Sequence, residues 1–262
     1  MNRRFGAASA ALSFVFGAGL AHAGVLYDNG PLVTYPGGGY MGADASRVQT
    51  DIGMATSGFG CTKTTFNYRL ADDFTVPAQG WTIDKITFYA FQVGSTTTST
   101  FTDVNVRIWD KAPNVAGATV VFGDNTTNRI AGTAFTNIYR DYDSSPGNNQ
   151  RPIMTITANI GATLTAGTYW VDFQLDGTIT SGAFAPPTTV KNVYSPCMPA
   201  PDCNAIQFNS TSWNAIYDAL SGTHQDLKFV IEGTDPNCAV ADTTNPAVTA
   251  PAPGTLAQSL CQ

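Results

Sequence analysis

The chain is poor in the residues on which many enzymes and nucleic-acid-binding proteins depend. Its 262 residues contain 2 histidines, and 13 lysines and arginines stand against 19 aspartates and glutamates, giving a formal net charge of -6. A protein that binds nucleic acid needs a basic stripe to displace the counterions of the phosphates. The acidic balance therefore argues against nucleic acid as a partner.

Glutamate is scarce as well, because Glu232 is the single glutamate of the chain. Glutamate, lysine and alanine normally fill the exposed faces of helices, whereas threonine, glycine and asparagine, which favour strands and turns, are abundant here. The composition thus predicts an all-β protein.

Histidine is limited to two positions, and one of them, His22, lies in the N-terminal segment discussed next. His224 lies in the polar stretch of residues 221–226, which is typical of an exposed turn. A serine or cysteine nucleophile usually needs a histidine as general base, and no G-x-S-x-G nucleophile elbow is found. The sequence therefore favours a non-catalytic protein.

Long apolar runs are missing after the first 23 residues, so no transmembrane helix is expected there. Residues 1–23 have a basic start, an apolar run that ends at Leu20, and an A-x-A pattern before Gly24. These features are typical of a secretory signal peptide. We expect the mature protein to be secreted, in the extracellular space or the periplasm.

The remaining chain divides into a domain and a tail. Residues 24–234 are predicted to form one β-sandwich domain, since all-β domains of this size commonly remain undivided. Residues 235–262 are rich in proline, threonine and alanine and show no apolar periodicity. We expect this last segment to be a tail or linker.

The five cysteines are expected to form disulfides, because an exported protein folds under oxidising conditions. Cys197 and Cys203 enclose a short loop with prolines and are predicted to pair. Cys238 and Cys261 form the second candidate pair, which leaves Cys61 over. Without a C-x-x-C motif, no zinc site is expected.

Alternation of apolar and polar residues predicts the strands, most clearly in residues 103–109 and 167–175. Residues 81–93 are apolar on both faces, which predicts a long central strand covered on its second side by a loop. Six further strands are expected at residues 24–27, 69–74, 119–122, 153–158, 205–208 and 227–232. Together they predict an antiparallel two-sheet β-sandwich with a jelly-roll-like order.

Four segments carry a resemblance to a known group of proteins. They are VLYDNG (residues 25–30), ADDFTVP (71–77), GTYW (167–170) and FVIEG (229–233). They resemble the landmarks of exported bacterial β-sandwich modules of cell-surface and secreted proteins, over nearly all of residues 24–233. The resemblance implies the architecture and export, and it implies no particular activity, since the group has none defined.

The leading candidate binding site lies on the polar faces of the two clearest strands. It comprises Trp109, Arg107 and Asn105 on one strand and Trp170, Asp172 and Gln174 on the other. Sugars bind such faces because their C–H patches stack on indole while their hydroxyls bond to planar polar groups. The sequence thus predicts a structural or adhesive module whose partners are glycans or cell-surface polymers. The alternative is that a loop, residues 185–194, covers these aromatic side chains as a second small core.

Aspartates supply two weaker hypotheses. Asp141 and Asp143 form a weak D-x-D arrangement that suits calcium as a cofactor, although a solvated acidic turn is the favoured explanation. Asp72 and Asp73 are the conspicuous pair for the alternative function, a secreted glycan-active hydrolase, which needs two carboxylates across a cleft. Adjacent strand residues point to opposite faces, so we expect one of the two to hydrogen-bond the turn that leads to residues 75–77 instead.

Overall fold

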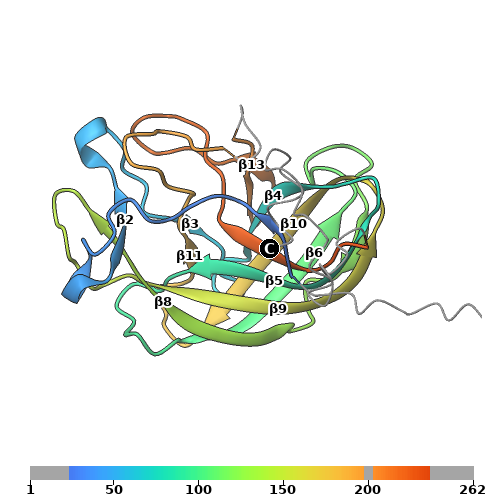
Figure 1. Cartoon of the computed structure of the whole chain (residues 1–262), viewed down its shortest axis with the longest axis horizontal. Helices are drawn as coiled ribbons and strands as arrows, with labels where there is room; N and C mark the ends of the chain where they lie inside the picture. The colour runs from blue at the N-terminus through green and yellow to red at the C-terminus, as the bar shows by residue number, and fades with distance from the viewer. Residues whose placement is uncertain (1–23, 198–202, 237–262) are drawn as a thin grey trace, which may run out of the picture.

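A computed structural model describes residues 24–197 and 203–236 of the chain. Two six-stranded sheets face each other and confirm the predicted all-β sandwich (Figure 1). The expected signal peptide, most of the expected tail, and the cysteines Cys238 and Cys261 lie outside the described residues. No helix in the described part of the chain is long and apolar enough to cross a membrane.

The first sheet has the strand order β1-β14-β5-β9-β8-β2. Its strands are β1 (Gly24–Asp28), β14 (Phe229–Thr234), β5 (Trp81–Ala90), β9 (Pro152–Leu164), β8 (Ile130–Tyr142) and β2 (Asp44–Val48). The strand β2 pairs with β8 in parallel, whereas the other neighbours in this sheet are antiparallel. Two 3-10 turns, η1 (Tyr40–Gly42) and η2 (Thr50–Ile52), flank β2.

The second sheet has the order β13-β12-β4-β10-β6-β7, and all of its neighbours are antiparallel. Its strands are β13 (Trp213–Ala215), β12 (Ile206–Asn209), β4 (Tyr68–Val76), β10 (Gly167–Gly177), β6 (Phe101–Trp109) and β7 (Val120–Gly123). A small ladder joins β11 (Phe184–Ala185) to β3 (Phe59–Gly60). The expected jelly-roll order is not confirmed by this topology.

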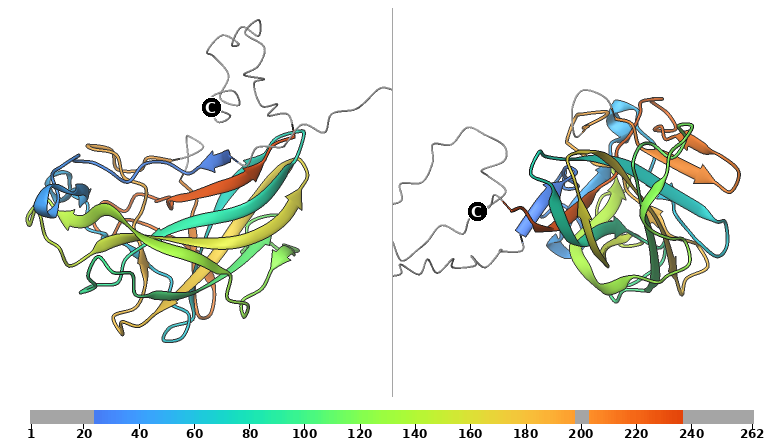
Figure 2. Two further views of the ribbon diagram at one scale, coloured as in Figure 1. Left: turned by 60° about the horizontal axis from the view of Figure 1, so that its bottom comes forward. Right: turned by 90° about the vertical axis from the view of Figure 1, so that its right-hand side faces the viewer.

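The main hydrophobic core fills the space between the two sheets, which Figure 2 shows as two layers. Phe88 on β5 and Phe173 on β10 meet there across the sandwich, with ring centroids 4.2 Å apart and both side chains buried. Burial of each such side chain contributes about 1.5–3 kcal/mol. Phe173 therefore identifies the inward face of β10, and the residues that alternate with it along the strand point outward.

The long strand β5 explains an irregular pattern in the sequence. Ile83 and Ile86 are both fully buried although they are three residues apart, and strict alternation would place them on opposite faces. The pairing of β5 with both neighbouring strands shifts register between Ile83 and Lys85, and this shift lets the side chains of Ile83 and Ile86 both point inward. The strand ends at Ala90, three residues before the predicted end, and the chain then bridges to β11 through Phe91 and Phe184.

Each of the predicted strand segments corresponds to a strand of the structure, and most ends differ by a few residues, whereas β9 continues from the predicted end at residue 158 to Leu164. Residues 81–93 have a second apolar side, as predicted. It is covered at Phe91, which packs with Leu32 and Ile153 in a second hydrophobic cluster. The thirteen-residue strand β8 was not predicted.

Candidate functional site

The six residues predicted for the binding site lie on neighbouring strands. β10 and β6 pair so that Trp170 lies opposite Trp109, Asp172 opposite Arg107, and Gln174 opposite Asn105. Their neighbours along the two strands, Val171, Phe173, Val106 and Ile108, belong to the core between the sheets. All six predicted residues therefore point to the outer face of the second sheet.

Four of these six side chains are buried, which corrects the expectation of an open polar face. The exposed fractions are 0% for Asn105 and Asp172, 2% for Gln174 and 8% for Trp170. Arg107 and Trp109 keep partial exposure. A ligand can therefore reach Arg107 and Trp109 directly, while the buried residues act from beneath.

Asp172 is the centre of a buried polar network on this face. Arg107 donates to the Asp172 Oδ2 atom through Nε at 2.7 Å, and the Trp109 indole nitrogen donates to the same oxygen at 2.9 Å. Arg69 on β4 donates through Nε to the other oxygen, Oδ1, and through Nη1 to Gln174. Charge-assisted bonds of this kind are the strongest in proteins, and they fix the orientation of the Trp109 ring.

Burial lowers the pKa of the Arg69 guanidinium, and the charge of Asp172 acts in the opposite direction. The carboxylate thus serves two guanidinium groups, those of Arg69 and Arg107. Since buried charges are tolerated only when they are paired, the network requires all three side chains.

Three tryptophans lie close together on this outer face, next to the network around Asp172. Trp170 forms a buried cluster with Ala71 and Ile206, against which Trp109, Trp213 and Ala112 pack. We call Trp109, Trp170 and Trp213 the tryptophan face. Trp109 and Trp213 are partly exposed.

The loop expected to cover this cluster lies elsewhere. In the segment of residues 185–194, the Thr188 amide donates to the Asp226 carbonyl and the Thr189 amide to the Pro31 carbonyl. The prediction of this loop as the cover was therefore wrong, whereas the predicted second small core is present, formed by Trp170, Ala71 and Ile206. The burial of Trp170 comes instead from its neighbours within the tryptophan cluster.

Two residues of this site were missed from the sequence. Trp213 lies on the three-residue strand β13, which is too short to show alternation. Arg69 begins a predicted strand, and its alternation with Ala71 and Asp73 does place it on the outer face. The signal that was available is this alternation, which places Arg69 on the same face as Ala71 and Asp73. Its burial follows from its bonds to Asp172 and Gln174 on the neighbouring strand.

Asp72 and Asp73 point to opposite faces of β4, as strand geometry requires. Asp73 lies opposite Trp170 on the outer face, while Asp72 accepts hydrogen bonds from Asn29 Nδ2 and the Leu227 amide, each at 2.8 Å. Burial raises the pKa of both carboxyl groups, and the charge of Asp226 raises that of Asp72 further. The expected role of this pair in a turn was wrong, since both residues lie within β4. Asp72 instead holds the residue that follows β1, Asn29, and a residue shortly before β14, Leu227.

The calcium hypothesis is corrected for Asp141 by an ion pair. Arg47 donates to both oxygens of the Asp141 carboxylate, at 2.9 and 3.0 Å, and the Gly147 amide donates at 2.8 Å. Asp141 is fully buried, so the guanidinium already supplies the positive charge that a cation would bring. Asp143 lies 4.0 Å from the Arg47 Nε atom and accepts a bond from the Asp51 amide.

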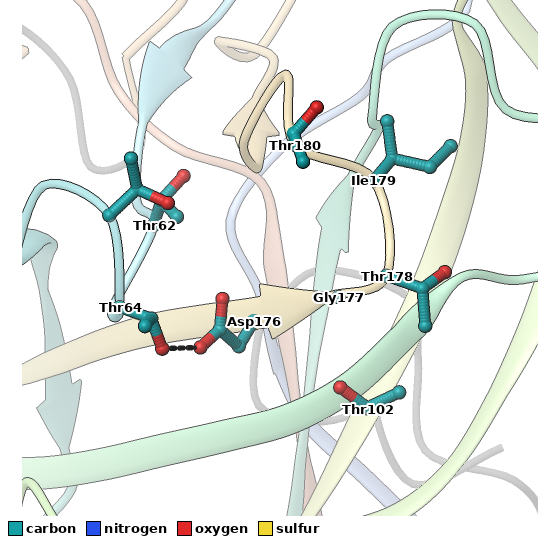
Figure 3. Close-up of a pocket in the computed structure, with 9 residues that line it drawn as sticks. Thr62, Thr64, Thr102, Asp176, Gly177, Thr178, Ile179 and Thr180 are labelled. Carbon is teal, nitrogen blue, oxygen red and sulfur yellow. Dashed lines mark hydrogen bonds between the residues drawn. The ribbon is translucent and has the colours of Figure 1, made fainter.

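A pocket of about 240 Å³ lies where β10 ends (Figure 3). Most of its lining consists of Asp176 and six threonines, namely Thr62, Thr64, Thr65, Thr102, Thr178 and Thr180. We call it the threonine pocket. Thr64 donates a hydrogen bond to the Asp176 carboxylate across it.

The cysteines agree with the sequence where they are described. Cys197 and Cys203 form the predicted disulfide. Cys61 is free and fully buried, and burial raises the pKa of its thiol. Asp226 lies close to both sulfurs of the disulfide, but sulfurs that are bonded to each other cannot serve as thiolate ligands for a metal.

His224 is exposed, as predicted, and the centroid of its ring lies 4.2 Å from that of Tyr217.

Comparison with known proteins adds no family: no family model matches the chain, and no curated protein matches its sequence. The function must therefore be inferred from the geometry of the sites.

Proposed function

We propose that the chain is an exported, non-catalytic interaction module that binds carbohydrate through the tryptophan face. The observation that carries this proposal is the convergence of three of the four tryptophans, from β6, β10 and β13, on one outer face. Flat indole surfaces stack against the C–H patches of sugar rings. Isolated exposed aromatics need no explanation, but a gathered set beside charged groups is typical of a binding surface.

Polar groups next to the indoles supply the hydrogen bonds that sugar hydroxyls require. The Arg107 side chain is 19% exposed, and its guanidinium lies 4.7 Å from the centroid of the Trp109 ring. Asp73 lies opposite Trp170 and is buried, as Trp170 is, so it supports the face from beneath. A partly exposed arginine beside a stacking surface suits a ligand whose hydroxyl oxygens accept hydrogen bonds.

The buried network beneath the face orders Trp109 and Arg107 before a ligand binds, which lowers the entropic cost of binding. Asp172 holds both Trp109 and Arg107 by hydrogen bonds, so neither side chain needs to be ordered when a ligand arrives. Immobilising a free side chain costs about 0.5–1.5 kcal/mol on binding. The network therefore contributes to affinity although the ligand does not contact Asp172.

A glycan-active hydrolase remains the alternative from the sequence, and the geometry of Asp72 and Asp73 does not favour it. Such an enzyme needs two carboxylates that face one substrate, about 5–9.5 Å apart across a cleft. Asp72 faces the sandwich interior and Asp73 the outer surface. This pair therefore gives no support to hydrolysis.

A glycan array probed with the purified chain tests the proposal. We expect binding to at least one glycan class, and we expect Trp109→Ala and Trp213→Ala each to weaken it by about tenfold or more, which corresponds to the loss of one aromatic contact. Tyr40→Ala is the matched control, because Tyr40 is an exposed aromatic residue in η1, outside the second sheet.

Two results would contradict the proposal. One is the absence of binding to every glycan on the array. The other is binding that Trp109→Ala and Trp213→Ala leave as strong as in the Tyr40→Ala control. Release of reducing sugar from any bound glycan would instead favour the hydrolase.

A further inference from the structure

The threonine pocket is separate from the tryptophan face and has a distinct chemistry. Thr62 and Thr64 line it from the segment before β4, Thr102 from β6, and Thr178 and Thr180 from the loop after β10 (Figure 3). Residues from three separated parts of the chain thus meet at one cavity. Its volume of about 240 Å³ is below the range of pockets for drug-sized ligands, about 300–1,000 Å³, so it suits a small molecule or one sugar ring.

Buried hydrogen bonds hold the walls of this pocket in place. Gln92 is 1% exposed and donates to the Ile179 carbonyl at 2.8 Å, which anchors the loop that carries Thr178 and Thr180. On the opposite wall, the Ala183 amide donates to the Thr62 hydroxyl at 2.7 Å. These two bonds fix the backbone of two walls, while the side chains of Thr64, Thr65, Thr102, Thr178 and Thr180 are exposed and leave the pocket open to solvent.

Gly177 lets the end of β10 pack closely against the Thr100 backbone and the Gln92 side chain. A Cβ atom at this position would lie 2.7 Å from the Thr100 carbonyl oxygen and 2.2 Å from the Gln92 Oε1 atom. Only glycine fits so close an approach. The strand β10 can therefore end against Gln92, with the Asp176 side chain directed to the pocket.

Asp176 carries a negative charge that no cationic side chain of the described residues neutralises. Lys63, the nearby cation, pairs at 2.8 Å with Asp103, which lies directly opposite Asp176 on β6. Thr64 donates to the Oδ2 atom of Asp176, and Oδ1 takes part in no hydrogen bond found within the described part of the chain. A carboxylate oxygen facing the pocket is thus available to accept from a ligand.

Several threonine hydroxyls of the pocket are available as well. Within residues 24–197 and 203–236, no hydrogen bond involves the hydroxyls of Thr65, Thr102, Thr178 or Thr180. A hydroxyl both donates and accepts, so these groups can pair with other hydroxyls in either direction. The threonine methyl groups and Ile179 add small apolar patches for C–H contacts.

We infer that the threonine pocket binds a single neutral, hydroxyl-rich sugar unit, with Asp176 as the central acceptor. An acidic sugar is disfavoured by the charge of Asp176, the one carboxylate that lines the pocket. A calcium ion is disfavoured because it takes six to eight oxygen ligands, usually with several carboxylates, and the lining holds one. The inference rests on the proposed function only for the class of ligand, since the site itself is a different one.

The test is a titration of the full chain with neutral hexoses such as glucose, galactose and mannose, followed by amide chemical shifts in NMR. At least one hexose is expected to shift the amides of Thr64, Asp176 and Thr178. Asp176→Asn is expected to weaken that binding by about tenfold or more, as the loss of a charged hydrogen-bond acceptor predicts. Asp84→Asn, at an exposed aspartate on β5, is the matched control and is expected to bind like the wild type.

A second variant keeps the test decisive if Asp176→Asn does not fold. Thr178→Val removes one exposed hydroxyl and keeps the shape of the side chain, and it is expected to weaken binding by about fivefold. Trp109→Ala is expected to leave hexose binding at the pocket unchanged. Loss of glycan-array binding in Trp109→Ala thus reports on the tryptophan face alone.

Three outcomes overturn the inference. The first is that no neutral hexose shifts the pocket amides. The second is that hexose binding is the same in Asp176→Asn, Thr178→Val and Asp84→Asn. The third is that glucuronate or calcium alone shifts these amides more strongly than any neutral hexose does.

Discussion

Asp172 on β10 lies directly opposite Arg107 on β6, and the Arg107 Nε atom donates to the Asp172 carboxylate at 2.7 Å. Asp172 is fully buried and also pairs with the buried Arg69. One carboxylate thus joins three neighbouring strands on the outer face of the second sheet. This relationship links the stability of the sheet to the orientation of the Trp109 side chain above it.

Replacing Asp172 by asparagine is expected to destabilise the protein strongly. The change leaves the guanidinium groups of Arg69 and Arg107 without their counter-charge, and breaking a buried ion pair in this way costs about 3–5 kcal/mol. Urea unfolding measures the difference in the free energy of unfolding. Asp84→Asn, at an exposed site, should stay within about 0.5 kcal/mol of the wild type. Equal stability of the two variants would show that the network contributes little.

Trp170 and Trp109 are expected to respond differently to truncation. Trp170 is 8% exposed, so Trp170→Ala should lower the free energy of unfolding by about 3–5 kcal/mol, as for other buried aromatic residues. Trp109 is partly exposed, and Trp109→Ala should cost less. Urea unfolding of both variants checks this order. A Trp170→Ala protein as stable as Trp109→Ala would contradict the burial described for the tryptophan face.

Asp72 is expected to make stability depend on pH. Burial, together with the charge of Asp226, raises the pKa of Asp72 in the folded state above the value of about 3.9 in an unfolded chain. Above about pH 4 the folded protein therefore retains a proton that the unfolded chain has released, so the free energy of unfolding falls as the pH rises toward the folded-state pKa.

The variant Asp72→Asn removes this titration and should flatten the dependence in that window. Urea unfolding of the wild type and the variant at several pH values from about 4 upward gives the two slopes. Parallel slopes would show that Asp72 titrates alike in the folded and unfolded chain. The comparison of slopes is needed because the substitution also changes the hydrogen bonds made by Asn29 and Leu227 at every pH.

Cys61 is expected to be unreactive in the folded protein. Its side chain is fully buried, and burial raises the pKa of its thiol, so the reactive thiolate is suppressed. Alkylation with iodoacetamide followed by peptide mapping should find Cys61 unmodified in native buffer and modified in urea. Rapid modification of Cys61 under native conditions would mean that the core between the sheets opens readily.

The sequence was sufficient for the pattern of strands because burial follows alternation in most of them. In β6 and β10 every second residue belongs to the core, and the period of two is plain in the sequence. The sequence did not predict the strand β8, because its thirteen residues are mostly half-buried or exposed and show no clear alternation. Asn137 also interrupts the strand with a positive φ of 60°. Its partner β9 supplies the regular alternation instead.

The site was predictable in part for the same reason. Alternation placed Trp109 and Trp170 on one polar face, and the strand register, which single-strand patterns do not contain, brought them opposite each other. The burial of Asp172 and Gln174 depends on Arg69, which reaches them from a third strand. Such a contact depends on strand order, and strand order follows from long-range packing rather than from any local pattern.

The most direct test of carbohydrate binding at the tryptophan face uses the indole N–H signals of the four tryptophans in NMR. Trp81 serves as an internal control, because it lies in the core between the sheets and its indole nitrogen donates to Asp235 at 3.3 Å. Addition of a glycan found on the array should shift the indole signals of Trp109 and Trp213 and leave that of Trp81 in place. Saturating glycan that moves neither the Trp109 nor the Trp213 signal would contradict the account.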